Sequence, residues 1–399
     1  MTRMNTNKDK KLYLYNSRNS YNSCNSLTPF LILLIIFLLL SCNVGDTDNN
    51  GNTVWGDTWD TAQPLKDIYK KKFLMGNIIS PSDLNNNAVS TIRFNYLKRH
   101  FNTLTAENHM KPDNIAPRTP PDSDDWNYQW TSADNIVAAA EAAKMNVVGH
   151  TLIWHSQTPA WLTTGTKEIV ENNLNKYVTE VVDHFKGKLI SWDVVNEAMR
   201  DGLTASDTSD GKWKTCLRPL SGNRWAIVDD YIEKAFLAAR AADPDVKLYY
   251  NDYNLNDANK ARAVYNMVND INTRHGKIID GIGMQSHHNK GTDPKTVDTS
   301  IKLFASLGVE VAISELDILT TTNLTAVPWN EDDIKTQAKR YALMFEVFKN
   351  NASNISRVTF WGIDDGTSWR KAYFPTLLDE NYKLKPAFYA VTNPNPNNY

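Results

Sequence analysis

The sequence is poor in cysteine. Only three of its 399 residues are cysteines: Cys24 and Cys42 lie near the N-terminus, and Cys216 stands alone in the body of the chain. No internal disulfide is therefore expected, and the fold must depend on the burial of apolar side chains. With 41% hydrophobic and 22% charged residues, the composition is that of a globular protein.

Positive charge is not in excess either. The formal net charge is −2, and residues 1–41 contribute +4 to it, which leaves −6 for the rest of the chain. Nucleic-acid binding requires clustered Lys and Arg side chains that contact phosphates. We therefore expect no nucleic-acid partner, and a neutral polymer fits the composition better.

Signals for a metal or a nucleotide cofactor are also missing. The first predicted strand leads into Gly76-Asn-Ile-Ile-Ser-Pro, which is not a glycine-rich phosphate loop. A zinc site built from His155, His287 and His288 is an alternative, but no thiolate and no HExxH spacing supports it. We expect neither a metal nor a cofactor.

An apolar run of modest length lies near the N-terminus. Residues 30–40 are uninterrupted Phe, Leu and Ile, which is shorter than the roughly 20 residues of a spanning helix but typical of a signal peptide. The run leads into Leu39-Leu-Ser-Cys42, which resembles a bacterial lipobox. We expect a lipoprotein signal peptide over 1–41, lipidation of Cys42, and anchoring at the outer membrane or cell surface. Ordinary secretion, an uncleaved anchor and a later start codon are the alternatives.

Short apolar runs alternate with stretches of helical periodicity from about Ala62 onward. The runs predict strands over 73–79, 103–107, 146–152, 189–197, 247–253, 281–287, 310–318 and 357–362. The periodicity predicts helices over 133–144, 169–185, 227–242, 258–275 and 332–349. Eight such repeats favour an α/β fold, a (β/α)8 TIM barrel, over a doubly wound open sheet. We expect a single catalytic domain over 62–392, after a flexible tether over 42–61.

Two glutamates stand where predicted strands end. Glu197 closes the fourth run, Ser191-Trp-Asp-Val-Val-Asn-Glu, and Glu315 lies in the seventh, Val311-Ala-Ile-Ser-Glu-Leu-Asp. Barrel enzymes place their sites at the carboxyl ends of the strands, and strands four and seven face each other across the mouth. A retaining glycosidase needs one carboxylic acid and one carboxylate on either side of a sugar. The pair predicts a glycosidase, with a structural role for both glutamates as the alternative.

The other predicted strands also end in polar or aromatic side chains. The polar and aromatic residues at these ends and in the loop after the eighth strand include Glu107, Asn108, Lys111, His150, Trp154, Asn196, Asn251, Asp252, Gln285, His287, Trp361 and Trp369. Of these, Lys111, His150 and Asn196 are predicted from their positions to contact sugar hydroxyls. Asp317 lies two residues beyond Glu315 and points the same way on the strand, so it is predicted to hold His287. Trp361 and Trp369 are predicted stacking platforms.

Several segments together resemble family 10 of the glycoside hydrolases, the retaining endo-β-1,4-xylanases. They are Gly149-His-Thr-Leu-Ile-Trp-His, Trp192-Asp-Val-Val-Asn-Glu-Ala, Gly283-Met-Gln-Ser-His, Ser314-Glu-Leu-Asp-Ile, Phe360-Trp-Gly and Ser368-Trp-Arg. The resemblance implies that Glu197 is the acid/base and Glu315 the nucleophile. It implies that Glu107 and Asn108 hold a sugar further toward the non-reducing end. The sugar at the cleavage point and the one beside it would be contacted by Lys111, His150, Trp154, Asn196, Gln285, His287, Trp361 and Trp369.

The sequence departs from the family pattern at two places, so subsite structure is not predicted there. Pro112 stands where a bulky residue is expected, and the polar segment 200–224 lies where leaving-group sugars bind.

The expected ligands are xylan and xylo-oligosaccharides, bound by a monomer. A β-1,4-glucanase or aryl glycosidase on the same barrel is one alternative, and an inactive surface glycan-binding lipoprotein is another.

Overall fold

A computed structural model describes residues 46–47, 53–54, 58–209, 212–324 and 330–399. The predicted signal peptide, Cys42 and most of the predicted tether lie outside these residues. Among the residues described, no helix is both long enough and apolar enough to cross a membrane.

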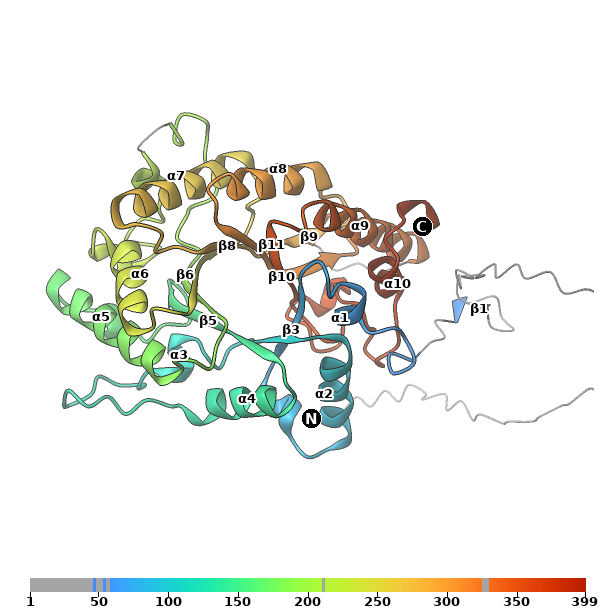
Figure 1. The fold of residues 1–399 in the computed structure, drawn as a ribbon, viewed down its shortest axis with the longest axis horizontal. Coiled ribbons are helices and arrows are strands. Elements are labelled where there is room, and N and C mark those ends of the chain that lie inside the picture. The colour runs from blue at the N-terminus through green and yellow to red at the C-terminus, as the bar shows by residue number, and fades with distance from the viewer. Residues whose placement is uncertain (1–45, 48–52, 55–57, 210–211, 325–329) are drawn as a thin grey trace, which may run out of the picture. The chain divides into compact units, whose positions relative to one another are not determined.

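A closed barrel of eight parallel strands forms the centre of the domain (Figure 1). The strands are β3 (Leu74–Ile79), β4 (Thr103–Ala106), β5 (Asn146–Trp154), β6 (Ser191–Asn196), β7 (Lys247–Asp252), β8 (Gly281–Met284), β10 (Glu310–Leu319) and β11 (Ile355–Phe360). They pair in chain order, and β11 closes the ring by pairing with both β10 and β3. The (β/α)8 prediction is confirmed, and the open-sheet alternative is wrong.

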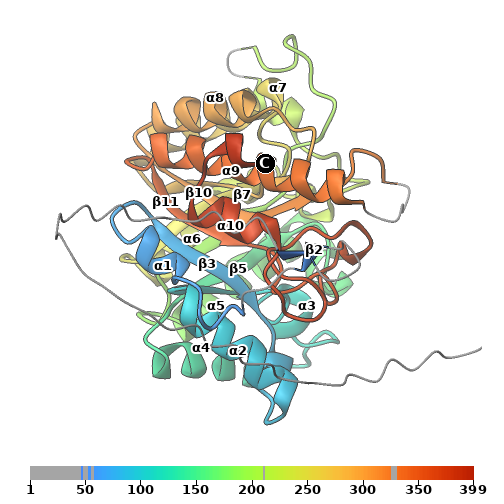
Figure 2. The same cartoon turned by 90° about the vertical axis from the view of Figure 1, so that its right-hand side faces the viewer.

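Helices surround the barrel on all sides (Figure 2). They are α1 (Leu65–Ile68), α2 (Ala88–His100), α3 (Pro112–Ile115), α4 (Thr131–Ala142), α5 (Lys167–His184), α6 (Tyr231–Ala242), α7 (Ala258–His275), α8 (Pro294–Ala305), α9 (Glu331–Asn350) and α10 (Pro386–Thr392). Five of them begin at a residue whose side chain accepts a first-turn N–H, namely Asn87, Thr166, Asp257, Asp293 and Asn330. Each such cap stabilises its helix by about 1 kcal/mol.

The interior of the barrel is partly polar, although the layer between strands and helices is apolar. Arg357 of β11 reaches across the barrel, where its NH2 lies 3.3 Å from Oδ1 of Asp193 on β6. Its guanidinium also lies over the ring of Tyr249, 4.7 Å from the centroid. All three side chains are at most 2% exposed. A buried cation of this kind requires a paired carboxylate. Asp193 provides this carboxylate and is therefore needed in the barrel interior.

A residue with a positive φ follows two of the strands that end earlier than the sequence predicts. β6 stops at Asn196, because Glu197 has a φ of +57° and leaves the ladder. β8 stops at Met284, because Ser286 has a φ of +60°. After that break the chain resumes as β9 (His287–Asn289), which pairs with the far half of β10. Left-handed residues end a strand by turning its next peptide out of register.

The last part of the predicted tether packs on the barrel. Thr58 pairs with Lys383, and the ring of Trp59 meets that of Tyr96 edge-on at 6.0 Å between centroids. The carbonyl oxygen of Trp59 lies 2.8 Å from Nε2 of His100. Residues 58–61 therefore belong to the packed domain, which begins ahead of residue 62.

Candidate active site

Glu315 lies inside β10, and side chains from neighbouring strands hold both of its carboxylate oxygens. Asn251 of β7 donates from Nδ2 to Oε1 at 2.7 Å, and Nε2 of His287 lies 3.2 Å from Oε2. Burial by itself raises the pKa of Glu315, but the hydrogen bond from His287 and the nearby His150 lower it below its ordinary value. The carboxylate is therefore ionised and fixed in orientation, as a nucleophile requires.

His287 carries the positive charge that balances Glu315. Its Nδ1 lies 3.0 Å from Oδ2 of Asp317. Burial alone would lower the pKa of His287, but the carboxylates of Asp317 and Glu315 raise it to about 9. The structure thus brings together the three side chains that the sequence predicts to form a chain. The imidazolium donates to the carboxylate of Glu315 and is itself oriented by Asp317.

Asp317 in turn is held by the loop that follows β11. Trp369 donates from Nε1 to Oδ2 at 3.1 Å, and Arg370 donates from NH1 to Oδ1 at 3.3 Å. Trp369 is 56% exposed, so its ring is open to a ligand, whereas Trp361 is only 6% exposed and meets His150 edge-on. The exposure fits a stacking role for Trp369 and leaves Trp361 little surface for one.

Glu197 is the first residue after β6, and its carboxylate accepts hydrogen bonds from the last residue of β5 and the first residue after β8. Trp154 donates from Nε1 to Oε2 at 3.0 Å, and Gln285 donates from Nε2 to Oε1 at 2.9 Å. The Glu197 backbone is held as well, since its N–H donates to the carbonyl oxygen of Asn251 at 2.8 Å and its own carbonyl oxygen accepts from Nε of Arg218 at 2.7 Å. Glu197 is less buried than Glu315, so it can meet a leaving group and water.

Asn196 links the two glutamates. Its Oδ1 accepts from Nδ2 of Asn251 at 2.9 Å and from Nε2 of Gln285 at 3.2 Å. The side-chain amide of Asn196 is therefore oriented with its oxygen, and not its NH2 group, toward these two donors. Asn251 holds Glu315 and Gln285 holds Glu197. The two carboxylates therefore belong to one polar network in the mouth of the barrel. Glu197 directly follows β6 as predicted, whereas Glu315 lies within β10, which continues past it to pair with β9.

The predicted sugar-binding residues Glu107, Asn108 and Lys111 follow β4, and Lys111 lies beside Trp154. Lys111 is buried, and its Nζ donates to Oδ1 of Asn108 at 2.9 Å and lies 4.9 Å from the centre of the Trp154 ring. Burial lowers the pKa of Lys111, against the opposing effect of the nearby carboxylates. Glu107 accepts from Oγ of Ser80 at 3.0 Å. Pro112 takes the first position of α3, where proline fits without a lost hydrogen bond.

His150 points into the barrel beneath the mouth. Its Nδ1 lies 3.0 Å from Oδ2 of Asp193, whose other oxygen pairs with Arg357. The His150 ring is thereby fixed from below, next to Glu315 and Trp361. His150 lies in the middle of β5, whereas the other nine predicted sugar-contacting residues lie at the carboxyl ends of the strands or beyond them.

Four residues of the site have no role in the sequence prediction. Asn251 and Asp193 hold Glu315 and His150, Gln157 donates from Nε2 to Oδ1 of Asn108 at 3.2 Å, and Arg218 holds the backbone of Glu197. Asn251 carried a usable signal, because it stands at the end of the fifth predicted strand. Gln157 and Arg218 lie in loops without periodicity, and no local pattern distinguishes them.

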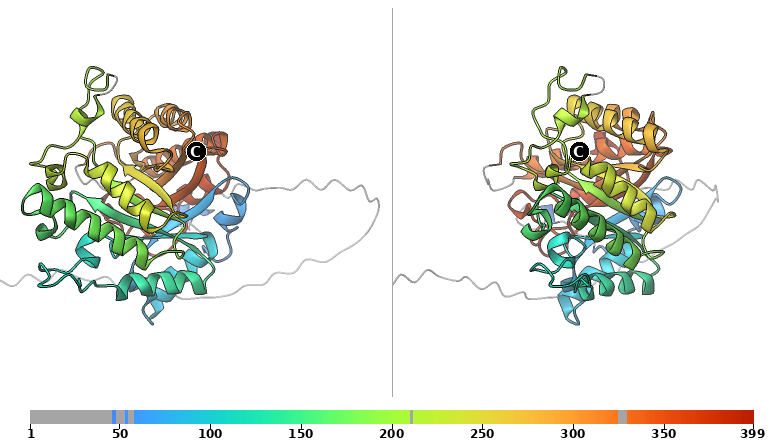
Figure 3. Two further views of the ribbon diagram at one scale, coloured as in Figure 1. Left: turned by 60° about the vertical axis from the view of Figure 1, so that its left-hand side comes forward. Right: turned by 90° about the vertical axis from the view of Figure 1, so that its left-hand side faces the viewer.

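The loop after β6 leaves the barrel beside α7 (Figure 3). Trp213, in this loop, is buried and donates from Nε1 to Oδ2 of Asp270 on α7 at 3.0 Å. Cys216 is buried in the same loop as a free thiol. Trp213 thus anchors the segment 200–224 on α7, and Arg218 of the same segment contacts the backbone of Glu197.

No metal centre is formed within the ranges that the structure covers, where no three His, Cys, Asp or Glu side chains converge on one point. His288 follows His287 on a strand and therefore points to the opposite face. Burial lowers the pKa of His288 to about 3, so its ring is neutral.

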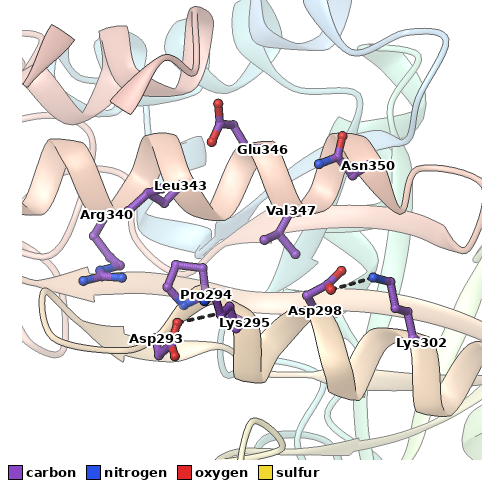
Figure 4. Close-up of a pocket in the computed structure, with 10 residues that line it drawn as sticks. All are labelled: Asp293, Pro294, Lys295, Asp298, Lys302, Arg340, Leu343, Glu346, Val347 and Asn350. Carbon is purple, nitrogen blue, oxygen red and sulfur yellow. Dashed lines mark hydrogen bonds and ion pairs between the residues drawn. The ribbon is translucent and has the colours of Figure 1, made fainter. Parts of the chain in front are cut away.

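A separate groove of about 510 Å³ lies between α8 and α9, on the helical ring (Figure 4). Its apolar lining is Pro294, Leu343 and Val347, and none of its lining residues belongs to the mouth. Asp298 pairs with Lys302 at 2.6 Å one turn along α8, and Asp293 caps that helix. These charges stabilise the helices that carry them.

Comparison with known proteins identifies the domain. The family model described as Glycosyl hydrolase family 10 matches residues 64–394. The "Beta-1,4-xylanase" of Dictyoglomus thermophilum is 35% identical over 375 residues, which cover 91% of this chain and 98% of that protein. The "Exoglucanase XynX" of Acetivibrio thermocellus is 35% identical over 88% of this chain. The chain spans only 29% of the length of the "Endo-1,4-beta-xylanase A" of Thermoanaerobacterium saccharolyticum and 31% of the length of XynX.

Solved structures agree with the sequence comparison. A crystal structure of TsXylA, an intracellular xylanase from Thermoanaerobacterium saccharolyticum bound to xylotriose, matches with a TM-score of 0.73 and 34% identity. The match covers 83% of this chain and 99% of that one.

Proposed function

This chain belongs to glycosyl hydrolase family 10, and from that premise we propose that it is an endo-1,4-β-xylanase acting on xylan and xylo-oligosaccharides. The observation that carries the proposal is the joining of Glu197 and Glu315 in one polar network at the barrel mouth. The xylanases among its relatives support the choice of substrate. We also propose that it acts as a monomer, because the residues of the proposed site belong to a single barrel.

The arrangement suits a retaining double displacement. An oxygen of Glu315 attacks the anomeric carbon as the glycosidic C–O bond breaks, and Glu197 gives its proton to the leaving oxygen. Glu197, now a carboxylate, takes a proton from water, and that water displaces Glu315 from the sugar. His287 and Asn251 hold both oxygens of the nucleophile throughout. Glu197 loses one proton to the leaving sugar and regains one from water, whose oxygen is added to the anomeric carbon, so the two steps balance without a cofactor.

Hydrolysis of unsubstituted β-1,4-xylan by residues 43–399 tests this function. We expect rapid release of short xylo-oligosaccharides, with little release of sugar from cellulose, because the xylanase relatives share this domain. Turnover of cellulose in place of xylan would favour the glucanase alternative, which the exoglucanase relative supports. Binding of xylan without turnover would favour the inactive glycan-binding lipoprotein.

We further propose that the protein is secreted and anchored to the bacterial envelope through a lipid on Cys42. The support is the sequence Leu39-Leu-Ser-Cys42 directly after the apolar run 30–40. In a bacterial host with lipoprotein processing, the full chain should incorporate labelled palmitate and sediment with membranes. Cys42→Ser should abolish the label, and Cys24→Ser is the matched control. Equal labelling of all three proteins, or of none, would contradict the proposal.

A further inference from the structure

A buried ammonium group lies behind Glu197 and outside the mouth. Lys260, the third residue of α7, is 2% exposed, and its Nζ lies 2.9 Å from Oδ1 of Asp252 and 3.0 Å from Oδ1 of Asp201. The same nitrogen lies 3.7 Å from the centre of the Tyr253 ring. Burial alone would lower the pKa of Lys260, but the two carboxylates raise it above its ordinary value. The group is therefore a permanent cation with three fixed neighbours.

One branch of contacts runs from Lys260 to the residues directly after Glu197. Tyr250 donates from its hydroxyl to Oδ2 of Asp252 at 2.5 Å. That hydroxyl accepts the backbone N–H groups of Ala198 at 3.0 Å and Met199 at 3.2 Å. Asp252 itself accepts from the Met199 N–H at 3.3 Å. Lys260 thus neutralises the carboxylate that orders the turn leaving Glu197.

A second branch reaches Glu197 from the loop side. The Tyr253 hydroxyl donates to Oδ2 of Asp201 at 2.5 Å and accepts from NH2 of Arg218 at 2.5 Å. Arg218 in turn donates to the backbone carbonyl oxygen of Glu197. Both branches therefore start at Lys260 and end on the backbone at or beside Glu197.

The backbone of Glu197 needs such support. Its φ of +57° lies in a region that residues with a side chain rarely adopt. A shift of this residue would displace the carboxyl group from the leaving oxygen, and proton transfer requires hydrogen-bond reach. Lys260 itself touches none of the predicted sugar-contacting residues.

We propose that Lys260 is a positioning residue for Glu197, which it holds in reach of the leaving group through Asp252 and through Tyr253 with Arg218. The inference rests on the proposed function of Glu197 as the acid/base. It predicts a defect in proton donation and not a general loss of the nucleophile's reactivity, because neither branch touches Glu315.

The test compares Lys260→Met with the unchanged enzyme on substrates of different leaving-group quality. Xylohexaose needs protonation of its leaving oxygen, whereas 2,4-dinitrophenyl β-xylobioside does not. Since kcat/KM reports the first covalent step, we expect it to fall at least tenfold for xylohexaose and less than threefold for the aryl xylobioside. Lys260→Arg restores the charge and should recover most of the loss on xylohexaose.

Controls separate this outcome from a general structural effect. Lys234→Met removes another ion pair, with Glu171, on the helical ring, and should change neither value. If Lys260→Met does not fold, Tyr253→Phe cuts the second branch and is judged by the same selective loss. Equal losses on both substrates, or no loss in a folded variant, would overturn the inference alone. If the enzyme without any substitution cleaves neither substrate, the proposed function itself would be overturned.

Discussion

Replacing Glu315 with alanine is expected to lower kcat on xylan by about 10⁵- to 10⁶-fold, the scale seen when an enzyme loses its covalent nucleophile. Glu315 is buried, ionised and held at both oxygens by Asn251 and His287. No other carboxylate in the described mouth has this combination of contacts. The loss should appear in kcat for every substrate, whatever its leaving group.

The matched control for this variant is Glu310→Ala. Glu310 is the first residue of β10, at the end of the strand opposite the mouth, where its carboxylate pairs with Lys247 at 3.3 Å. It should keep full activity, so a loss in both variants would point to damage of the strand. Azide should restore turnover to Glu315→Ala and yield an α-linked xylosyl azide, because it attacks from the face that Glu315 leaves empty. Retention of more than about 1% of the activity would contradict the assignment.

Replacing Glu197 with alanine is expected to lower kcat/KM on xylo-oligosaccharides by about 10²- to 10⁴-fold, the usual contribution of a general acid. With 2,4-dinitrophenyl β-xylobioside the first step needs no proton, so kcat/KM should be nearly unchanged. The second step lacks its base, so a rapid burst of phenolate should precede slow turnover. Stopped-flow absorbance of the released phenolate measures both phases.

Azide also distinguishes this variant from the first one. It should speed the slow phase of Glu197→Ala and produce a β-linked xylosyl azide, because it attacks the glycosyl-enzyme from the side opposite Glu315. An α-linked product from Glu197→Ala would exchange the two assignments. Absence of a burst, with equal losses on both substrates, would assign Glu197 a structural role.

Much of the fold was predictable because its signals are local. The alternation of apolar runs and helical periodicity predicted eight strands, and all eight occur within two or three residues of the expected bounds. Breaks caused by single backbone angles were not predictable. Glutamate and serine rarely adopt a positive φ, so the sequence does not indicate that Glu197 and Ser286 have one. Each of these residues follows a strand that ends earlier than predicted.

The site was predictable to the extent that it follows from strand ends. In a parallel barrel every strand delivers its last side chains to the same rim, so Glu197, Glu315 and His287 could be placed together from their positions alone. Asn251 shares that strand-end signal, but its position alone does not indicate that it binds Glu315. Roles drawn from the family resemblance remain predictions that the variants above test.

The sequence by itself determined the barrel, the two glutamates at its mouth and the family to which the chain belongs, because these depend on short-range patterns and on motifs within single segments. Only the tertiary structure decided what surrounds each glutamate. Asn251 meets Glu315, and Lys260 reaches the turn after Glu197, across contacts between residues up to 64 positions apart. The physical reason is that closure of the barrel sets which strands and loops face each other, and this decides which buried charges find partners.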